Sequence, residues 1–392
     1  MKWTNRGILI LLVLAGSVAV AETPTQSVTV DCNNGQSLNG TLSNLNKQTP
    51  TTVSVNGTCT EYVQVIGFEN LVLKGLAGAT LLQPTTGAGN LFNSLLFIES
   101  SRSVTVDRFS IQADTVTVPA VGIGHGSSDI RLRNLKIQGG TSGIAVFENS
   151  QVSIAYVTAQ DPEYSALGVY DLSDVHVERS LFENSSGALW HAGMDVGASH
   201  VTVYDTTISN MQVGINGHGG AIIDVLTFDT YYPLGGASDV IIENSAGTNY
   251  NGVIIDTGGS LNVTGAKLVI NKPGQTYGGT SGGVLISDGA SMTASNGYLV
   301  ITGSNGQGVM ALNNSHATVI GATVTRGSHG GLVAANLSSI DVSAGTTLSL
   351  VSGNSVDLFC DPDSTISGSV NLSGVPTAQC TNLLSGETVT LP

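Results

Sequence analysis

The segment SGIAVFENSQVSIAYV, residues 142–157, decides the fold because it recurs in altered form along most of the chain. It begins with a glycine among alternating apolar residues, turns through polar residues, and continues with a second apolar alternation. The same order occurs in LGVYDLSDVHVERSLF at 167–182 and in GVMALNNSHATVIGATV at 308–324. Apolar residues at every second position are typical of β-strands, and the polar turns between them leave no room for helices.

A glycine begins each unit, and most of these glycines lie 21 to 25 residues apart: Gly122, Gly143, Gly168, Gly193, Gly214, Gly252, Gly283, Gly308 and Gly331. Two longer spacings, of 38 and 31 residues, indicate insertions around 224–250 and 266–282. One such unit cannot bury its apolar face alone, so the units must stack into a solenoid with a continuous core. We therefore predict a single all-β solenoid, a parallel β-helix of roughly fourteen coils.

The units at 142–157 and 308–324 resemble the repeats of right-handed parallel β-helix proteins, the pectin lyase-like superfamily that includes pectate lyases and polygalacturonases. The segment at 55–84 is similar to the first coils of that superfamily. The resemblance covers most of the chain and implies a right-handed parallel β-helix with capped ends. It implies little about activity, because this fold is found in lyases, hydrolases, epimerases and adhesins.

The first 21 residues have the pattern of a signal peptide. Lys2 and Arg6 precede an apolar run at 8–16, and Ala19, Val20 and Ala21 fit a cleavage site. The run is too short to cross a membrane comfortably, and no later apolar run is long enough for a transmembrane helix. We expect the chain to be exported and released to the periplasm or the extracellular space, with an uncleaved anchor as the alternative.

Four cysteines lie near the two ends of the chain: Cys32, Cys59, Cys360 and Cys380. An even number of cysteines in an exported protein favours disulfides, and we expect the local pairs 32–59 and 360–380. The long spacings do not resemble zinc ligand sets, so we expect no metal and no cofactor. The predicted divisions are a signal peptide at 1–21, caps at 22–60 and 359–392, and a β-helix at 61–358.

The chain has a formal net charge of −15, and loss of Lys2 and Arg6 with the signal peptide would leave −17. Such a chain should repel nucleic acid and anionic membranes, so we expect neither as a partner. A polyanionic substrate would need a local basic strip or bridging cations. Five cations lie close together at 102–136, either as a basic spot or as a solvated surface paired with acids: Arg102, Arg108, Arg131, Arg133 and Lys136.

Alternation assigns the residues of each strand to the inside or the outside of the solenoid. In the strand at 193–196, Met194 and Val196 should point inward and Asp195 outward. The predicted outward column on this side runs Ala145, Tyr170, Asp195, Asn216, Ile254, Leu285, Met310, Val333. Its last four residues form an apolar stripe, which we expect either to be covered by a loop or the C-terminal segment or to be the interface of a homo-oligomer.

Two enzyme classes of the superfamily fit this chain poorly. Polygalacturonases carry paired acids, but no Asp-Asp pair occurs here, and the tripeptides at 124–126 and 217–219 (Gly-His-Gly) follow their strand instead of preceding it. Pectate lyases need clustered aspartates for Ca²⁺ and an arginine base; Arg131 and Arg133 are present, but the cluster is not. Whether the protein is an enzyme stays open; lyase or epimerase chemistry is favoured over that of a polygalacturonase.

Aromatic, histidine and acidic residues concentrate between residues 160 and 232. Aromatic faces stack on sugar rings, and acids, amides and imidazoles bond hydroxyl groups, so we predict polysaccharide binding or processing on these coils. The candidate catalytic residues are Asp195, His191 and Tyr170, and the candidate ligand-binding residues are Trp190, Asp171, Asn216, His218 and Tyr204. Two alternatives remain open: that the aromatic residues only pack loops, and that the protein is a noncatalytic adhesin-like or structural β-helix.

Overall fold

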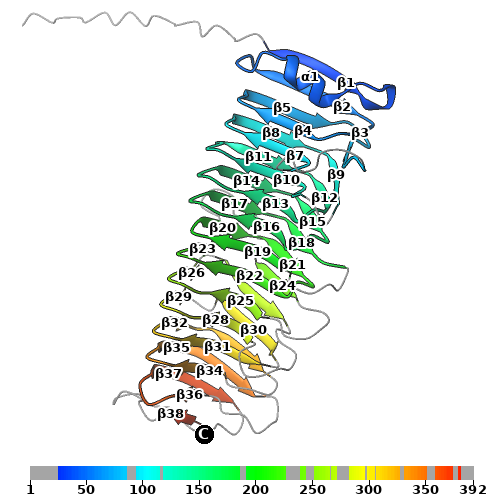
Figure 1. The fold of residues 1–392 in the computed structure, drawn as a ribbon. Coiled ribbons are helices and arrows are strands. Elements are labelled where there is room, and N and C mark those ends of the chain that lie inside the picture. The colour runs from blue at the N-terminus through cyan, green and yellow to red at the C-terminus, as the bar shows by residue number, and fades with distance from the viewer. Residues whose placement is uncertain are drawn as a thin grey trace, which may run out of the picture.

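The computed structural model is a rod of stacked coils, most of which contain three short parallel strands (Figure 1). It describes residues 25–85, 94–114, 118–185, 191–226, 239–243, 251–264, 266–271, 282–295, 298–304, 306–326, 331–350, 358–373 and 378–380. The predicted signal peptide at 1–21 and the candidate residue Trp190 lie outside these ranges.

Three ladders of strands run along the rod. Sheet 1 has 13 strands: β4 (Val63–Ile66), β7 (Leu96–Glu99), β10 (Val121–Gly124), β13 (Ser142–Val146), β16 (Ser165–Val169), β19 (Ala192–Gly197), β22 (Val213–His218), β25 (Asn251–Ile255), β28 (Gly282–Ile286), β31 (Gln307–Leu312), β34 (Leu332–Ala335), β36 (Leu358–Cys360) and β38 (Ala378–Cys380). Sheet 2 contains β1 (Gln26–Asp31), β2 (Thr51–Asn56), β5 (Glu69–Gly75), β8 (Arg102–Asp107), β11 (Ile130–Arg133), β14 (Gln151–Ala155), β17 (Asp174–Glu178), β20 (His200–Tyr204), β23 (Ile222–Val225), β26 (Ser260–Val263), β29 (Ser291–Ala294) and β32 (His316–Ile320).

Sheet 3 contains β3 (Thr58–Thr60), β6 (Thr80–Leu82), β9 (Ser110–Ala113), β12 (Lys136–Gly139), β15 (Thr158–Gln160), β18 (Leu181–Glu183), β21 (Thr206–Ser209), β24 (Val240–Glu243), β27 (Leu268–Asn271), β30 (Leu299–Ser304) and β33 (Thr323–Arg326). The long strands β35 (Ser339–Leu350) and β37 (Thr365–Ser373) lie in both sheets 2 and 3 and join them into one 25-stranded sheet.

Strands of successive coils pair in parallel and in register, as Leu167 does with Met194 and Met194 with Ile215. The predicted all-β solenoid is therefore confirmed. Sheet 1 contributes one strand to each coil and has 13 strands. The described part of the rod therefore has slightly fewer coils than the predicted fourteen. The ladders also extend into both predicted caps, since β2 pairs with β5 and β36 with β38.

Alternating residues of all three sheets point into one hydrophobic core that runs along the rod. In β17, for example, Val175 and Val177 are fully buried, whereas Asp174, His176 and Glu178 face outward. Because each coil packs only on its two neighbours, stability accumulates from coil to coil and not from contacts between distant coils. Alternation in the sequence thus correctly assigned Asp195 to the outside and Met194 and Val196 to the inside of β19.

From Gly193 onward, the glycine that begins a unit is required because the next coil lies too close for a side chain. A Cβ atom on Gly214 would lie 2.5 Å from the carbonyl oxygen of Gly252 and 2.5 Å from Cγ2 of Ile242. A Cβ atom on Gly193, Gly252 or Gly283 would likewise meet the carbonyl oxygen of the corresponding glycine in the next coil. The spacing of these glycines in the sequence therefore gives the number of residues in each coil.

Buried serines form a second ladder, at the corner between sheets 1 and 2. The Ser173 hydroxyl oxygen accepts a hydrogen bond from the backbone N–H of Ser150 at 3.2 Å, and that of Ser199 accepts from Ser173 at 3.1 Å. In later coils the backbone N–H of Ser315 donates to the Ser338 hydroxyl, and the N–H of Ser338 donates to the Ser364 hydroxyl, both at 3.1 Å. Since these groups are buried, each serine satisfies a backbone donor that water cannot reach.

Replacement of Ser173 by alanine should leave the Ser150 N–H without its acceptor. An unsatisfied buried donor costs about 1–3 kcal/mol, so we expect Ser173→Ala to lower the free energy of unfolding by about that amount. The control is Ser153→Ala, which removes a hydroxyl from the outer face of β14 and should cost less than about 0.5 kcal/mol. Equal unfolding midpoints for the two variants in urea would show that the ladder does not stabilise the rod.

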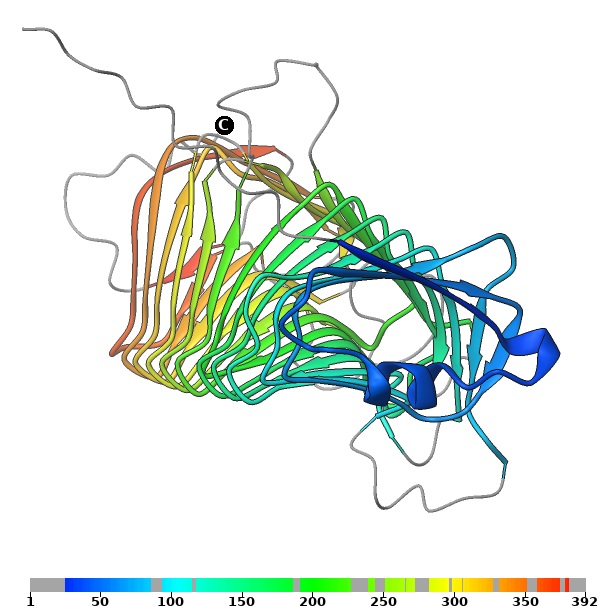
Figure 2. The same ribbon diagram turned by 90° about the horizontal axis from the view of Figure 1, so that it is seen from above.

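The N-terminal end of the rod is closed by β1, the short helix η1 (Cys32–Asn34) and α1 (Leu38–Asn44), which lie over the first coils (Figures 1 and 2). Leu38 and Leu42 of α1 are fully buried. The Glu61 carboxylate accepts hydrogen bonds from the Leu38 N–H at 2.6 Å and the Ser37 hydroxyl at 2.6 Å, which satisfies the start of this helix. This arrangement covers strand edges that would otherwise be open.

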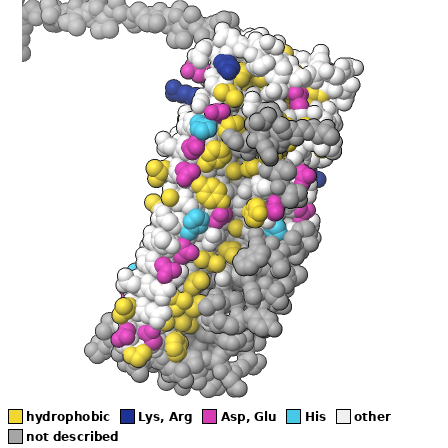
Figure 3. All heavy atoms as spheres, viewed as in Figure 1, with side chains coloured by type: hydrophobic (Ala, Val, Ile, Leu, Met, Phe, Trp, Pro, Cys, Tyr) yellow, Lys and Arg dark blue, Asp and Glu magenta, His cyan; other side chains and the backbone are white. Residues whose placement is uncertain are grey.

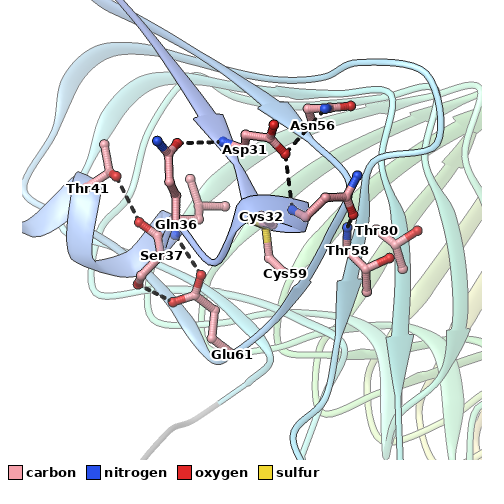
Figure 4. The surroundings of a disulfide bond; sticks show 12 residues. Asp31, Cys32, Gln36, Ser37, Thr41, Asn56, Thr58, Cys59, Glu61 and Thr80 are labelled. Carbon is pink, nitrogen blue, oxygen red and sulfur yellow. Dashed lines mark hydrogen bonds between the residues drawn. A yellow bond between two sulfur atoms is a disulfide. The ribbon is translucent and has the colours of Figure 1, made fainter.

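A disulfide joins Cys32 to Cys59 and fastens η1 to β3 (Figure 4), as predicted. Glu61 lies beside it, but both sulfur atoms are committed to the disulfide and the carboxylate to α1, so this group is not a metal site. At the other end, Cys360 is also disulfide-bonded, and Cys380 lies opposite it in register. The pairing 360–380 stays a prediction that this register supports.

Candidate functional site on the outer face of sheet 1

Four polar and aromatic side chains meet at Asp195, on the outer face of sheet 1 where β16, β19 and β22 lie side by side. The Tyr170 hydroxyl donates a hydrogen bond to Oδ2 of Asp195 at 2.6 Å. Nδ2 of Asn216 donates to Oδ1 at 2.7 Å, and Nε2 of His218 lies 3.5 Å from the same oxygen. We call Tyr170, Asp195, Asn216 and His218 the Asp195 cluster.

The register explains how three coils contribute to this cluster. Asp195 pairs with Gly168 on one side and with Asn216 on the other, and Gly197 pairs with His218. The predicted outward column was wrong at one position, because Gly168 and not Tyr170 lies beside Asp195. Tyr170 follows two residues later along the chain, and its ring extends back so that the hydroxyl reaches the carboxylate.

Glycines allow the two rings to lie flat against the sheet. A Cβ atom on Gly168 would lie 2.7 Å from Cε2 of Tyr170, and one on Gly197 would lie 2.7 Å from Cε1 of His218. Any side chain at these positions would push a ring away from Asp195. The glycines that flank the cluster are therefore part of its geometry.

The cluster is accessible and is chemically mixed. The side chain of Asp195 is 25 % exposed and that of His218 is 41 % exposed. Burial, reinforced by the Asp195 carboxylate, raises the pKa of Tyr170 well above its ordinary value, so the phenol stays protonated and remains a donor. The outer face thus presents a carboxylate, an amide, an imidazole and a ring surface together, a combination that suits the hydroxyls and faces of a sugar.

The structure does not bring the other predicted residues to this cluster. His191, which precedes β19, is only 5 % exposed, and burial lowers the pKa of its imidazole. Asp171 lies in the exposed turn after Tyr170, with a left-handed φ of 58°. Tyr204 lies on sheet 2, where its ring packs on His176 at 5.2 Å between centroids, so its proposed role in the same site does not fit this geometry.

Sequence reasoning missed a second group on the same face, closer to the N-terminal end. The imidazole of His125 lies 3.5 Å from Glu99 and contacts Glu148, and its ring meets those of Phe97 and Phe147 edge-on. The tripeptide that contains His125 was predicted to follow its strand, and His125 does lie directly after β10, with a left-handed φ of 53°. The signal was that the Gly-His-Gly tripeptide occurs twice, each time at the end of a sheet 1 strand.

The apolar stripe lies in one column, as predicted: Ile254, Leu285, Met310 and Val333 are neighbours in register. Figure 3 shows acidic, histidine and hydrophobic side chains mixed along the middle of this side of the rod and mainly hydrophobic ones toward the C-terminal end. Met310 is only 3 % exposed and the others are half-buried, so the stripe is not a fully open patch. A homo-oligomer through this stripe stays a prediction.

Comparisons with known proteins agree with this fold. Residues 90–229 match a family model described as "Right handed beta helix region". The catalytic unit of a thermostable GH87 α-1,3-glucanase from Streptomyces thermodiastaticus superposes with a TM-score of 0.54 at 12 % identity, over 88 % of this chain and 69 % of that one. None of the curated proteins compared matches the sequence. The chain has the right-handed parallel β-helix fold that the resemblance implied.

Two other structures superpose with lower scores. PfbA, a surface adhesin of Streptococcus pneumoniae, superposes with a TM-score of 0.35 at 12 % identity, over 87 % of this chain and 92 % of that one. A polygalacturonase from Erwinia carotovora ssp. carotovora gives 0.34 at 11 % identity, over 95 % and 99 %. In the described part of this chain, no helix is both long and apolar enough to span a membrane.

Proposed function

We propose that this protein is exported and binds polysaccharide on the outer face of sheet 1, at the Asp195 cluster. The observation that carries the proposal is the convergence of Tyr170, Asn216 and His218 on one accessible carboxylate. Three coils supply these groups, so the rigid ladder holds them in place before a ligand arrives. A saccharide lying along the rod would meet the ring of Tyr170 and the polar groups of Asp195, Asn216 and His218 in turn.

Binding fits the cluster better than catalysis does. Lyase or epimerase chemistry needs a base, and a Tyr170 phenol whose pKa is raised by burial and by Asp195 cannot serve as one at neutral pH. Glycoside hydrolysis needs two carboxyl groups across the bond, and within the described residues Asp195 is the only carboxylate of the cluster. The catalytic roles of Asp195, His191 and Tyr170 therefore stay predictions.

Replacement of Asp195 by asparagine should weaken polysaccharide binding at least tenfold. The amide would place N–H groups near the donors of Tyr170 and Asn216 and break the cluster. Binding is measured by affinity electrophoresis of the mature protein against neutral and acidic polysaccharides, including an α-1,3-glucan because the glucanase that shares the fold is named for one. Release of reducing ends or unsaturated products is followed in the same mixtures.

Asp224→Asn is the matched control. The Asp224 carboxylate also accepts from an asparagine, Asn262 at 2.8 Å, and lies 3.0 Å from His200, but on the outer face of sheet 2. The two substitutions should cost similar stability, and only Asp195→Asn should cost binding. Absence of binding by the parent protein, or equal losses in both variants, would overturn the proposal. If the parent protein releases products from a polysaccharide and Asp195→Asn does not, Asp195 has a catalytic role.

A further inference from the structure

A pocket lined by cations lies at the corner between sheets 2 and 3, near the N-terminal end of the rod. It has a volume of about 610 Å³ and is lined by residues 74–80, 108–110 and 134. It arises because four residues, 76–79, connect β5 to β6, whereas two residues, Arg108 and Phe109, connect β8 to β9 in the next coil. This size falls within the range of small-ligand sites.

The register gathers positive charge around this corner. Lys74 and Arg133 lie on either side of Asp107 in the ladder, and Arg108 follows Asp107 directly. Lys136 lies opposite Ser110, which lines the pocket. Three cations are therefore neighbours of Asp107 and a fourth, Lys136, lies beside the pocket, on a chain whose formal net charge is −15.

Three of these four cations lack the acidic partner that some other arginines on the rod have. Asp107 accepts from Asn134 at 2.7 Å and lies 3.4 Å from Nε of Arg108. Among the described residues, Lys74, Arg133 and Lys136 form no ion pair. By contrast, Arg131 and Arg179 have acidic partners, Asp129 at 2.8 Å and Asp205 at 3.4 Å.

We propose that this pocket binds the carboxylate or sulfate groups of an acidic polysaccharide. The ammonium group of Lys74, which lines the pocket and forms no ion pair among the described residues, is free to pair with such an anion. Arg108 contacts Asp107 through Nε, and the other nitrogens of its planar guanidinium can donate to the same anion. Leu76, 40 % exposed, and Ala77 supply an apolar wall against which a sugar ring can lie. The pocket and the Asp195 cluster lie on different sheets, so this proposal does not depend on the function proposed above.

The test compares three probes: polygalacturonate, which carries carboxylates, dextran sulfate, and neutral dextran. Dissociation constants are measured for the parent and for the double variant Lys74→Gln, Arg108→Gln at two salt concentrations. We expect the double variant to bind at least one of the two acidic probes at least tenfold more weakly at low salt, with a smaller salt dependence, because fewer counterions are displaced. Neutral dextran should not bind this pocket.

Arg179→Gln is the control, because Arg179 occupies the same corner position in a later coil and also lies 3.4 Å from an aspartate, Asp205, but does not line the pocket. If the double variant binds polygalacturonate more weakly than the parent does, the pocket recognises carboxylates. If it loses affinity for dextran sulfate alone, the pocket recognises sulfates. The proposal is overturned if the parent binds neither acidic probe or if the double variant binds both as tightly as the parent does. It is also overturned if Arg179→Gln weakens binding as much as the double variant does. Loss in Asp195→Asn but not in the double variant would place the anion at the Asp195 cluster instead.

Discussion

Replacement of Gly214 by alanine should destabilise the rod by about 3 kcal/mol or more, although it adds a single methyl group. The added Cβ would lie 2.5 Å from the carbonyl oxygen of Gly252, and backbone cannot rotate away as a side chain can. Relief would require the two coils to separate, which would break the parallel ladder between β22 and β25. Overpacking in a core that can adjust costs about 1–3 kcal/mol, and this site cannot adjust.

Gly258→Ala distinguishes this collision from ordinary glycine strain. Gly258 has a left-handed φ of 74°, and a Cβ there would meet no atom within 4 Å. Alanine in that conformation costs about 1–2 kcal/mol through the backbone alone. Denaturant unfolding followed by circular dichroism should therefore give a clearly lower midpoint for Gly214→Ala than for Gly258→Ala. Equal midpoints would mean that the contact between coils is not what requires glycine.

Replacement of Phe182 by alanine should cost about 3–5 kcal/mol, the usual range for removing a buried phenylalanine. Phe182 is fully buried in β18, and its neighbours in register are Ala159 and Ile208. Ala159 is already small, so the truncated side chain would leave a cavity that this neighbour cannot fill.

The control for this cavity is the adjacent residue, Leu181, which lies on the outer side of the same strand. Leu181→Ala removes a comparable apolar group without opening the core, and we expect a loss below about 1 kcal/mol. Thermal unfolding of both variants provides the measurement. A loss for Phe182→Ala as small as that for Leu181→Ala would mean that the core around β18 closes over the missing ring.

The fold was predictable because each coil repeats the same physical constraints. Alternation identified the buried residues of β17 and β19, and the spacing of Gly193, Gly214 and Gly283 reported coil length because each glycine meets the next coil. The buried serines were not predicted, since Ser173 and Ser199 look like ordinary turn residues in the sequence. Their role depends on an N–H from another coil, which a single sequence does not display.

The candidate site was predictable in part. Asp195 and Asn216 occupy equivalent positions of successive units, so their proximity followed from the repeat. Tyr170 was placed two residues away from where it lies, because its proximity depends on a side chain reaching back over Gly168. His191 and Tyr204 were grouped with Asp195 through closeness in sequence. The corners of the coil instead bury His191 and place Tyr204 on sheet 2.

In-register stacking also determines the step by which this protein can change its length. Gln151, Asp174 and His200 occupy one column, and Val175 faces Val152 in the neighbouring coil. Excision of residues 152–174 would join Gln151 to Val175, which would then occupy the position that Val152 had held. Whole coils are therefore interchangeable segments of the rod, whereas loss of a single residue from a strand would turn its apolar side chains toward the solvent.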